Sequence, residues 1–306
     1  MNKYPVAVFL FKRPELTKKL LDEIASFDPS KIYIFQDAPR NKNEAKLTAL
    51  VTKLIFKFVD SNSNINFDIS IAKENLGIKR NIVQGITKVF TKERELIIFE
   101  DDCLPHKDFY YFAKTLLVKY ANNPRIMSIA GSGVGTFNKN SYNFSKYQQC
   151  WGWATWKRAW DLYDDKMLTF GSPEWNKLSL EIWPNIFMRF YFTTMLLLTK
   201  KGQVKSWAFK WSYAHFANHG LAIIPSGNLI SNLGFDSSAT NTVTYSPLSN
   251  LPTIPLKAPL THPEKICDNI LLSKKIEKYY YYNPIAILGM LRQLFYYLVK
   301  KYAHRT

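Results

Sequence analysis

The chain has 306 residues, of which 47% are hydrophobic and 15% aromatic, so it can build a sizeable core and is not globally disordered. Its formal net charge of +17 favours an anionic partner: a phosphorylated substrate, an acidic lipid surface or nucleic acid. The three cysteines are odd in number, far apart and without a CxxC pair, which argues against a zinc ribbon or a disulfide scaffold and favours a reducing cytoplasm.

The first apolar run, residues 6–11, is six residues long and therefore shorter than the roughly 7–15 residues of a signal-peptide core. It predicts a first buried strand. No uninterrupted apolar run approaches the ~18 residues that a membrane span needs. We therefore expect a cytoplasmic protein.

From that strand onward, strand and helix patterns alternate. This alternation predicts an α/β fold with a mostly parallel central sheet and helices on both faces. In such sheets, ligands bind outside the carboxyl ends of the strands. The expected strands are residues 6–11, 31–35, 67–71 and 95–99, and the expected helices are residues 14–26, 43–59 and 78–90.

Polar residues follow each expected strand at the end where ligands bind. After the fourth strand come three carboxylates, here called the acidic triplet: Glu100, Asp101 and Asp102. An isolated triplet is also typical of an acidic turn before a helix, but its position level with the other polar residues favours a metal-bound diphosphate site. A glycine entering a basic helix start likewise suits a phosphate. The other strand-end residues are Arg13, Asp37, Asn75, Gly77 and Lys79.

Further along, a helix over residues 107–120 and a strand over residues 126–130 are expected. The glycines of residues 131–135 match neither a P-loop nor a dinucleotide-binding fingerprint. A tryptophan-rich stretch follows, with Trp151, Gly152 and Trp153. It fits either an aromatic platform that stacks on a sugar or a buried hinge between sheet and helices, and both remain open.

Asp161, Asp164 and Asp165 are expected on a helical stretch, followed by an apolar helix over residues 173–200. Residues 206–211 open another helix, which carries His215 and His219 at i, i+4 spacing. Because no HExxH motif is present, a solvated or capping role is favoured over metal binding for this pair. Residues 221–225 are expected to form a late strand.

The tail from residue 273 to residue 306 holds seven Lys or Arg and one Glu. Its helix, opened by Pro284, is basic and amphipathic, which is the composition of an interfacial helix. Packing of this helix against the domain or a partner is the alternative. The apolar face consists of Ile285, Leu288, Leu291, Phe295, Leu298 and Tyr302.

In their order and spacing, these motifs resemble those of the GT-A glycosyltransferases of the bacterial family 2-like kind. They are also similar to those of the eukaryotic N-acetylglucosaminyltransferases that start complex N-glycans. The resemblance covers about residues 5–242. It is carried by residues 11–14, 36–37, 75–77, 100–102, 151–153 and 232–235.

The resemblance implies a GT-A fold, a nucleotide-sugar donor that is most often UDP-linked, and inverting transfer with Mn²⁺ or Mg²⁺. By position, Arg13 and Asp37 would face the base, and Lys79 the phosphates. Asp101 would lie near the ribose, and Asp102 would be the metal ligand, with donor diphosphate and waters completing the shell. The remaining donor residues would be Asn75, Gly77 and Glu100, and the acceptor platform Trp151, Gly152, Trp153 and Trp207.

An inverting transferase also needs a general base. Relatives often carry a carboxylate after a tryptophan at the place where this chain has Trp207 and Ala208. The base is therefore expected elsewhere. The candidates are Asp161, Asp164, Asp165 and Asp236.

These observations predict a hexosyl- or N-acetylhexosaminyltransferase that builds a bacterial surface glycan, such as capsule or lipooligosaccharide, at the inner membrane face. Its acceptor would be a glycan or lipid-linked glycan, and no nucleic acid is expected. The alternatives are a nucleotidyltransferase that makes activated sugars and a catalytically impaired sugar-binding homologue. The expected parts are a donor-binding half (residues 1–130), an acceptor-binding and catalytic half (residues 131–250) and a C-terminal extension (residues 251–306).

Overall fold

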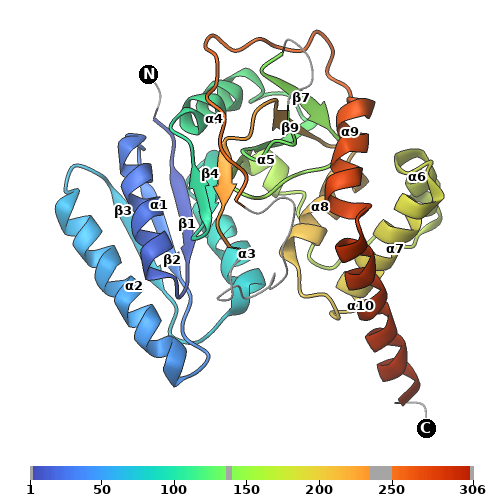
Figure 1. The fold of residues 1–306 in the computed structure, drawn as a ribbon, viewed down its shortest axis with the longest axis horizontal. Coiled ribbons are helices and arrows are strands. Elements are labelled where there is room, and N and C mark those ends of the chain that lie inside the picture. The colour runs from blue at the N-terminus through green and yellow to red at the C-terminus, as the bar shows by residue number, and fades with distance from the viewer. Residues whose placement is uncertain (1–2, 136–139, 235–249, 304–306) are drawn as a thin grey trace.

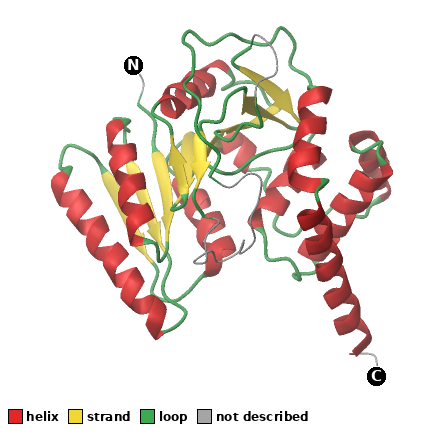
Figure 2. Ribbon diagram, viewed as in Figure 1, coloured by secondary structure: helices red, strands yellow, loops and turns green. Residues whose placement is uncertain are grey.

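The computed structural model describes residues 3–135, 140–234 and 250–303. A twisted eight-stranded sheet with the order β3-β2-β1-β4-β8-β6-β9-β7 runs through the centre of the molecule (Figures 1 and 2). Helices cover both of its faces. The α/β fold with a mostly parallel sheet is therefore as the sequence predicts.

The first half of the sheet is parallel, because β1 pairs with both β2 and β4, and β2 pairs with β3. Its strands are β1 (Val6–Leu10), β2 (Ile32–Gln36), β3 (Phe67–Ile71) and β4 (Glu95–Glu100). The helices between them are α1 (Pro14–Ser26), α2 (Lys42–Ser61) and α3 (Gly77–Val89).

Alternate side chains of β1 enter two different cores. Val6 and Val8 pack with the buried faces of α1 and α2, whereas Ala7 and Phe9 pack with α3 on the opposite face. Side chains alternate between faces along any strand, so a run that is apolar throughout requires helices on both sides. This burial positions the carboxyl ends of β1, β2 and β4 along one edge.

The second half of the chain extends the same sheet. β8 (Trp153–Trp156) lies antiparallel between β4 and β6 (Ile126–Ala130). β9 (Leu221–Pro225) runs parallel to β6, and β7 (Tyr142–Ser145) runs antiparallel to β9 at the edge. The predicted boundary at residue 130 thus falls between strands of one sheet, and the functional division into donor and acceptor halves stays a prediction.

A small second sheet lies directly after the acidic triplet. It consists of β5 (Cys103–Pro105) and β10 (Ile230–Asn232), which pair antiparallel so that Cys103 lies opposite Asn232. α4 (Asp108–Lys119) follows β5 and buries its apolar face against the sheet.

The helical part of the second half corrects two predictions. The helix expected over residues 173–200 is two helices, α6 (Pro173–Ile182) and α7 (Ile186–Lys200). Pro184 disfavours helical backbone at the residue before it, and Asn185 caps α7 by accepting from the N–H groups of Phe187 and Met188. The helix expected around Asp161 to Asp165 is α5 (Lys157–Trp160), which ends before all three aspartates.

α8 (Trp207–Ala217) carries His215 into the core, contrary to the expected solvated or capping role. Its Nε2 lies 3.3 Å from Oγ of Ser128, and its ring meets Trp211 edge-on. Burial lowers the pKa of His215 to about 3, so the imidazole is neutral. His219 lies beyond the end of α8 with a φ of 50°.

The C-terminal segment first packs on the domain and then projects from it. α9 (Ile270–Ile276) and the π-helical turn η1 (Glu277–Tyr281) bury Leu272 and Ile276 among residues of α7 and α8. α10 (Pro284–Ala303) contacts α7 and buries Met290, but its second half extends away from the body (Figure 1). Within the described residues, every helix is too short or too polar to cross a membrane.

Candidate functional site

The carboxyl ends of three parallel strands converge at one edge of the sheet. Phe9 of β1 lies opposite Glu100 of β4, and Leu10 lies opposite Gln36 of β2. The residues that follow these strands therefore enter the same region. Arg13, Asp37 and the acidic triplet, which the sequence places after different strands, are brought together here.

Arg13 binds the acidic triplet directly. Its Nη1 lies 2.6 Å from Oδ2 of Asp102 and 3.2 Å from Oδ1 of Asp101. The backbone N–H of Phe11 also donates to Asp101, over 3.3 Å. Arg13 and Asp101 are each only 11% exposed, so these are largely desolvated charges. The loop after β1 is thereby fastened to the end of β4.

One guanidinium does not neutralise three carboxylates. Burial and the charge of Asp102 together raise the pKa of Asp101 to about 7, although Arg13 opposes both effects. Burial and the two neighbouring aspartates also raise the pKa of Glu100 well above its usual value. The triplet thus carries more negative charge than its surroundings stabilise, and an added cation would lower its energy.

The segment after β10 closes over Asp102. The N–H of Leu233 donates to the backbone carbonyl of Asp102 over 2.8 Å. A Cβ on Gly234 would lie 2.1 Å from Oδ2 of Asp102, a distance that no real Cβ tolerates. Glycine therefore lets the chain pass this carboxylate without displacing it. Sequence reasoning missed this constraint because residues 102 and 234 are distant in the chain.

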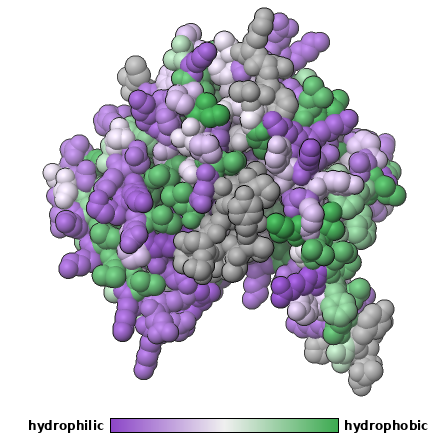
Figure 3. All heavy atoms as spheres, in the orientation of Figure 1, coloured by the Kyte–Doolittle hydropathy of each residue, from purple (hydrophilic) through white to green (hydrophobic). Residues whose placement is uncertain are grey.

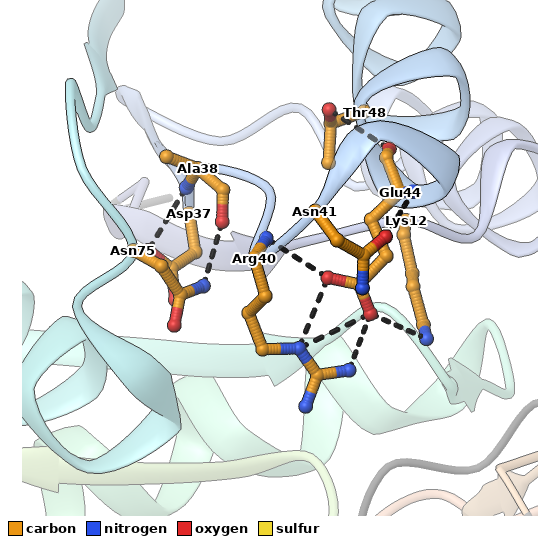
Figure 4. A network of polar contacts seen from close by, with 8 residues as sticks. All are labelled: Lys12, Asp37, Ala38, Arg40, Asn41, Glu44, Thr48 and Asn75. Carbon is orange, nitrogen blue, oxygen red and sulfur yellow. Dashed lines mark hydrogen bonds and ion pairs between the residues drawn. The ribbon is translucent and has the colours of Figure 1, made fainter.

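Asp37 organises the loop that leads into α3. Its Oδ1 accepts from the N–H of Leu76 over 2.8 Å, and its Oδ2 accepts from the N–H of Gly77 over 2.9 Å and from Nδ2 of Asn75 over 3.2 Å. Figure 4 shows Asn75 reaching back to Asp37 and to the carbonyl of Ala38. Gly77 has a φ of 73°, which favours glycine. Asp37, Asn75 and Gly77 thus form one unit, and contact of Asp37 with a base stays a prediction.

A second carboxylate beside this loop was missed from the sequence. Glu44, in the first turn of α2, accepts from Nζ of Lys12 over 2.9 Å and from the backbone N–H and guanidinium of Arg40 (Figure 4). The Arg40 hydrogen bonds lower the pKa of Glu44 to about 2, and Lys12 assists against the effect of burial. The signal was present, since Asn41 and Glu44 have the spacing of a capping box and Asn41 caps Glu44.

The three candidate bases that the structure describes are all engaged. Both carboxylate oxygens of Asp161 lie within 2.8 Å of Nζ of Lys157. Asp164 accepts from the backbone N–H groups of Lys166, Met167 and Leu168, and so closes a turn. Asp236, the fourth candidate, lies outside the described residues.

Asp165 forms ion pairs with two lysines. Its Oδ1 lies 2.8 Å from Nζ of Lys79 and 2.9 Å from Nζ of Lys210. Hydrogen bonds from these lysines lower the pKa of Asp165, although burial opposes them. A carboxylate with a lowered pKa is a weaker base. Lys79, predicted to contact phosphates, thus points to Asp165 in this structure.

The predicted aromatic platform is corrected in part. Trp153 and Trp207 are both buried and stack on each other with centroids 5.7 Å apart, so they are core residues and offer no face to a sugar. Trp151 is half-buried and lies against Tyr280. Gly152 has a φ of 56° and passes tightly over Ile230 of β10, which explains the glycine by packing.

The triplet suits a hard divalent cation by its chemistry. Carboxylate oxygens are the ligands that Mn²⁺ and Mg²⁺ prefer, and the bound guanidinium of Arg13 shows that a cation fits beside Asp102. Across the described ranges, no group of three or more His, Cys, Asp or Glu side chains is arranged to hold a metal ion. A metal here would therefore take part of its shell from a ligand.

Neither a protein-family model nor a curated protein matches the chain. Solved structures resemble it at low identity. The mannosyltransferase PcManGT from Pyrobaculum calidifontis, in complex with GDP-Man and Mn²⁺, is 10% identical over 71% of this chain and 72% of its own, with a TM-score of 0.38. TarS 1–349 from S. aureus is 13% identical over the same shares, with a TM-score of 0.40. A 4-diphosphocytidyl-2C-methyl-D-erythritol synthase from Anaerococcus prevotii is 9% identical over 53% of this chain and 74% of its own, with a TM-score of 0.35.

Proposed function

We propose that the chain is a GT-A glycosyltransferase that moves a sugar from a nucleotide-diphosphate donor, UDP-linked by preference, to a surface-glycan acceptor with inversion. The observation that carries this proposal is the acidic triplet at the carboxyl end of β4, where the pKa values of Glu100 and Asp101 are raised and the guanidinium of Arg13 binds Asp101 and Asp102. Ligands of parallel α/β sheets bind at this edge. A site short of positive charge there suits a metal–diphosphate group.

Within this proposal, Asp102 would bind the metal directly, and the neighbouring carboxylates of Asp101 and Glu100 would add negative charge near it. A bound Mn²⁺ or Mg²⁺ would share the negative charge of the leaving diphosphate. Arg13 holds Asp101 and Asp102 in place and, by the family resemblance, lies on the base side of the donor. Asp37 fixes the loop of Asn75 and Gly77.

Inversion needs a group that takes the proton of the acceptor hydroxyl as the hydroxyl attacks the anomeric carbon. Asp161, Asp164, Asp165 and Asp236 remain the proposed candidates. The first three already bind a lysine or backbone N–H groups, which leaves each less available. This engagement, together with Ala208, favours the second candidate function, a sugar-binding homologue with impaired transfer.

A nucleotidyltransferase is the other candidate that uses a parallel sheet and a carboxylate-bound metal. Such an enzyme carries a Gly-rich loop with Lys or Arg directly after its first strand. Here that position reads Phe11, Lys12, Arg13 and Pro14, with Lys12 bonded to Glu44 and Arg13 to the triplet. The engagement of both basic residues disfavours this alternative. Pyrophosphate release from a nucleoside triphosphate and a sugar phosphate would favour it.

We also propose that α10 rests on the acidic inner surface of the cell membrane. This helix exposes Leu288 (65%) and Phe295 (64%) beside the exposed cations Arg292, Lys300 and Lys301. Figure 3 shows hydrophobic and hydrophilic side chains together on this projection. An apolar face flanked by cations binds anionic lipid. Vesicles with phosphatidylglycerol should sediment the protein, neutral vesicles should not, and Phe295→Ser should weaken sedimentation.

The donor proposal is tested by thermal shift with UDP-, GDP- and CDP-sugars, with and without Mn²⁺. One nucleotide class should raise the melting point only with the metal, because a ligand stabilises the fold it binds. Asp102→Asn should abolish that shift and lower donor hydrolysis or transfer at least ~100-fold, or about 3 kcal/mol. Asp22→Asn, an exposed aspartate paired with Lys18, is the matched control and should change neither. Metal-independent turnover that survives Asp102→Asn would reject the proposal.

A further inference from the structure

A pocket lined mainly by lysines lies apart from the acidic triplet. It has a volume of about 500 Å³ and is formed by the start of α3, the turn after α5, the end of α7 and the start of α8. Figure 1 shows α7 and α8 side by side, and α3 contacts α8. We call this site the lysine pocket, after Lys79, Lys166, Lys200, Lys201, Lys205 and Lys210.

The floor of the pocket is a preassembled ion cluster. Lys210 is a buried lysine whose Nζ donates to the carbonyl and, over 2.9 Å, to the carboxylate of Asp165. Lys79 approaches the same carboxylate over 2.8 Å. Burial lowers the pKa of Lys210, with the charge of Lys79 adding to the effect. Asp165 is the one acidic side chain among the described residues of the lining and serves as its counter-ion.

The rim adds cations that have no counter-ion among the described residues. Lys166, Lys201 and Lys205 are exposed and form no ion pair within the part of the chain that the structure describes. Gly202, with a φ of 75°, turns the chain after α7 so that Lys201 and Lys205 both reach the pocket. Nζ of Lys200 is held by the carbonyls of Met167 and Phe170.

Charge and lining define the ligand class. Several ammonium groups converging on one concavity match a small anion that carries multiple charges and several acceptor oxygens, as a phosphoryl or diphosphate group does. The described residues of the lining include no aromatic side chain and so offer no stacking surface to a nucleobase. A single strand of nucleic acid would also need a longer basic groove than this pocket provides.

We propose that the lysine pocket binds a phosphoryl or diphosphate group, without a metal, between Lys79 and Lys210 on its floor and Lys201 and Lys205 at its rim. The binding itself is independent of the acidic triplet. Only the identity of the phosphorylated molecule, the donor or a phosphate-bearing acceptor, rests on the proposed function. In either case the site gives the second half of the chain a direct contact with substrate phosphate.

The test uses the full chain and inorganic pyrophosphate, titrated by calorimetry without divalent metal. Lys201→Gln/Lys205→Gln should weaken binding at least ~10-fold, because both lysines line the pocket and neither forms an ion pair with another described residue. Lys53→Gln/Lys57→Gln on exposed positions of α2 removes the same charge elsewhere and should leave the affinity within ~2-fold. Equal loss in both double variants, or no pyrophosphate binding by the wild type, would overturn the proposal.

Two further arms identify the source of the phosphate. If the pocket binds the donor, UDP should compete with pyrophosphate, and UDP affinity with Mn²⁺ should fall in Lys201→Gln/Lys205→Gln. If it binds an acceptor phosphate, saturating UDP should leave pyrophosphate binding intact. Asp102→Asn should not change metal-free pyrophosphate binding in either case, so pyrophosphate binding tests the lysine pocket even if the donor proposal fails. Weaker pyrophosphate binding by that variant would contradict a site separate from the acidic triplet.

Discussion

The acidic triplet holds three carboxylates against the guanidinium of Arg13, whereas the lysine pocket holds six lysines against the carboxylate of Asp165. The acidic triplet therefore has an excess of negative charge with a positive counter-ion, Arg13, and the lysine pocket has an excess of positive charge with a negative counter-ion, Asp165. They differ in burial: Arg13 is 11% exposed in side-chain terms, and Asp165 is 52% exposed.

This difference in burial separates an ion pair that stabilises the fold from an ion pair that a ligand can replace. A desolvated pair is costly to break, because the remaining partner stays buried and unpaired. A solvated pair is weak and screened by salt, so an incoming ion readily replaces one partner. The comparison implies that Arg13 holds the fold around the triplet, while Asp165 is easily displaced by a ligand anion.

The largest expected effect comes from removing the buried counter-ion. Arg13→Met should destabilise the fold by about 3 kcal/mol in urea unfolding at pH 7, because Asp101 and Asp102 lose their partner. The pKa of Asp101 is raised by burial, so its contribution to stability is present below about pH 4 and is lost as the pH rises through 7. The loss in the variant should therefore shrink at pH 4, and millimolar Mn²⁺ should restore part of it at pH 7. Equal destabilisation at both pH values would contradict a charge-based role.

A smaller effect is expected from Glu44, which fastens Lys12 and Arg40 beside the triplet. Hydrogen bonds from Arg40 lower its folded pKa to about 2 against an ordinary 4.5. Its stabilisation is therefore present above pH 4.5 and is lost as the pH falls towards 2. We expect wild-type protein to lose about 2 kcal/mol more than Glu44→Gln between pH 6 and pH 3, by urea unfolding at each pH. Parallel pH profiles for the two proteins would contradict this.

A still smaller effect is expected where Gly234 passes Asp102 of the acidic triplet. Gly234→Ala should cost about 1.5 kcal/mol, because its methyl group would overlap Oδ2 of Asp102, and it should also weaken metal-dependent donor binding. Gly289→Ala is the matched control. It lies in α10 with no atom near the added Cβ and should be neutral or slightly stabilising. Similar unfolding midpoints for both variants would show that the tight approach is relieved by small shifts.

The smallest effect belongs to the solvated counter-ion. Asp165→Asn should destabilise the fold by about 1 kcal/mol or less at low salt, since Asp165 is half-exposed. Inorganic phosphate should offset the loss by binding Lys79 and Lys210 in place of the carboxylate, and chloride at equal ionic strength should not. Destabilisation as large as that caused by Arg13→Met would contradict the distinction between a buried and a solvated counter-ion.

Sequence reasoning was most successful where the signal is local. The strands and helices of residues 6–100 follow from short apolar runs and helical periodicity, and the structure has all of them. It failed where contacts between residues distant in the chain decide whether a side chain is exposed or buried. The stretch of Trp153 reads equally well as platform or core, and only the burial of Trp153 and its stacking on Trp207 show that both are core residues. Pro184 could have been read as a helix break, since it restricts Trp183, but the apolar character of residues 173–200 masked it.

By itself, the sequence determined that polar residues stand at the ends of parallel strands, because strand direction in alternating strand–helix units places those ends at one edge. The tertiary structure decided what each of them binds. Arg13 lies 89 positions from Asp102, and Lys79 lies 86 positions from Asp165. Such pairings depend on how the elements pack in space, and no local pattern encodes them. The acidic triplet was therefore visible in the sequence, whereas its guanidinium partner, the glycine that passes it and the lysine pocket emerged only from the fold.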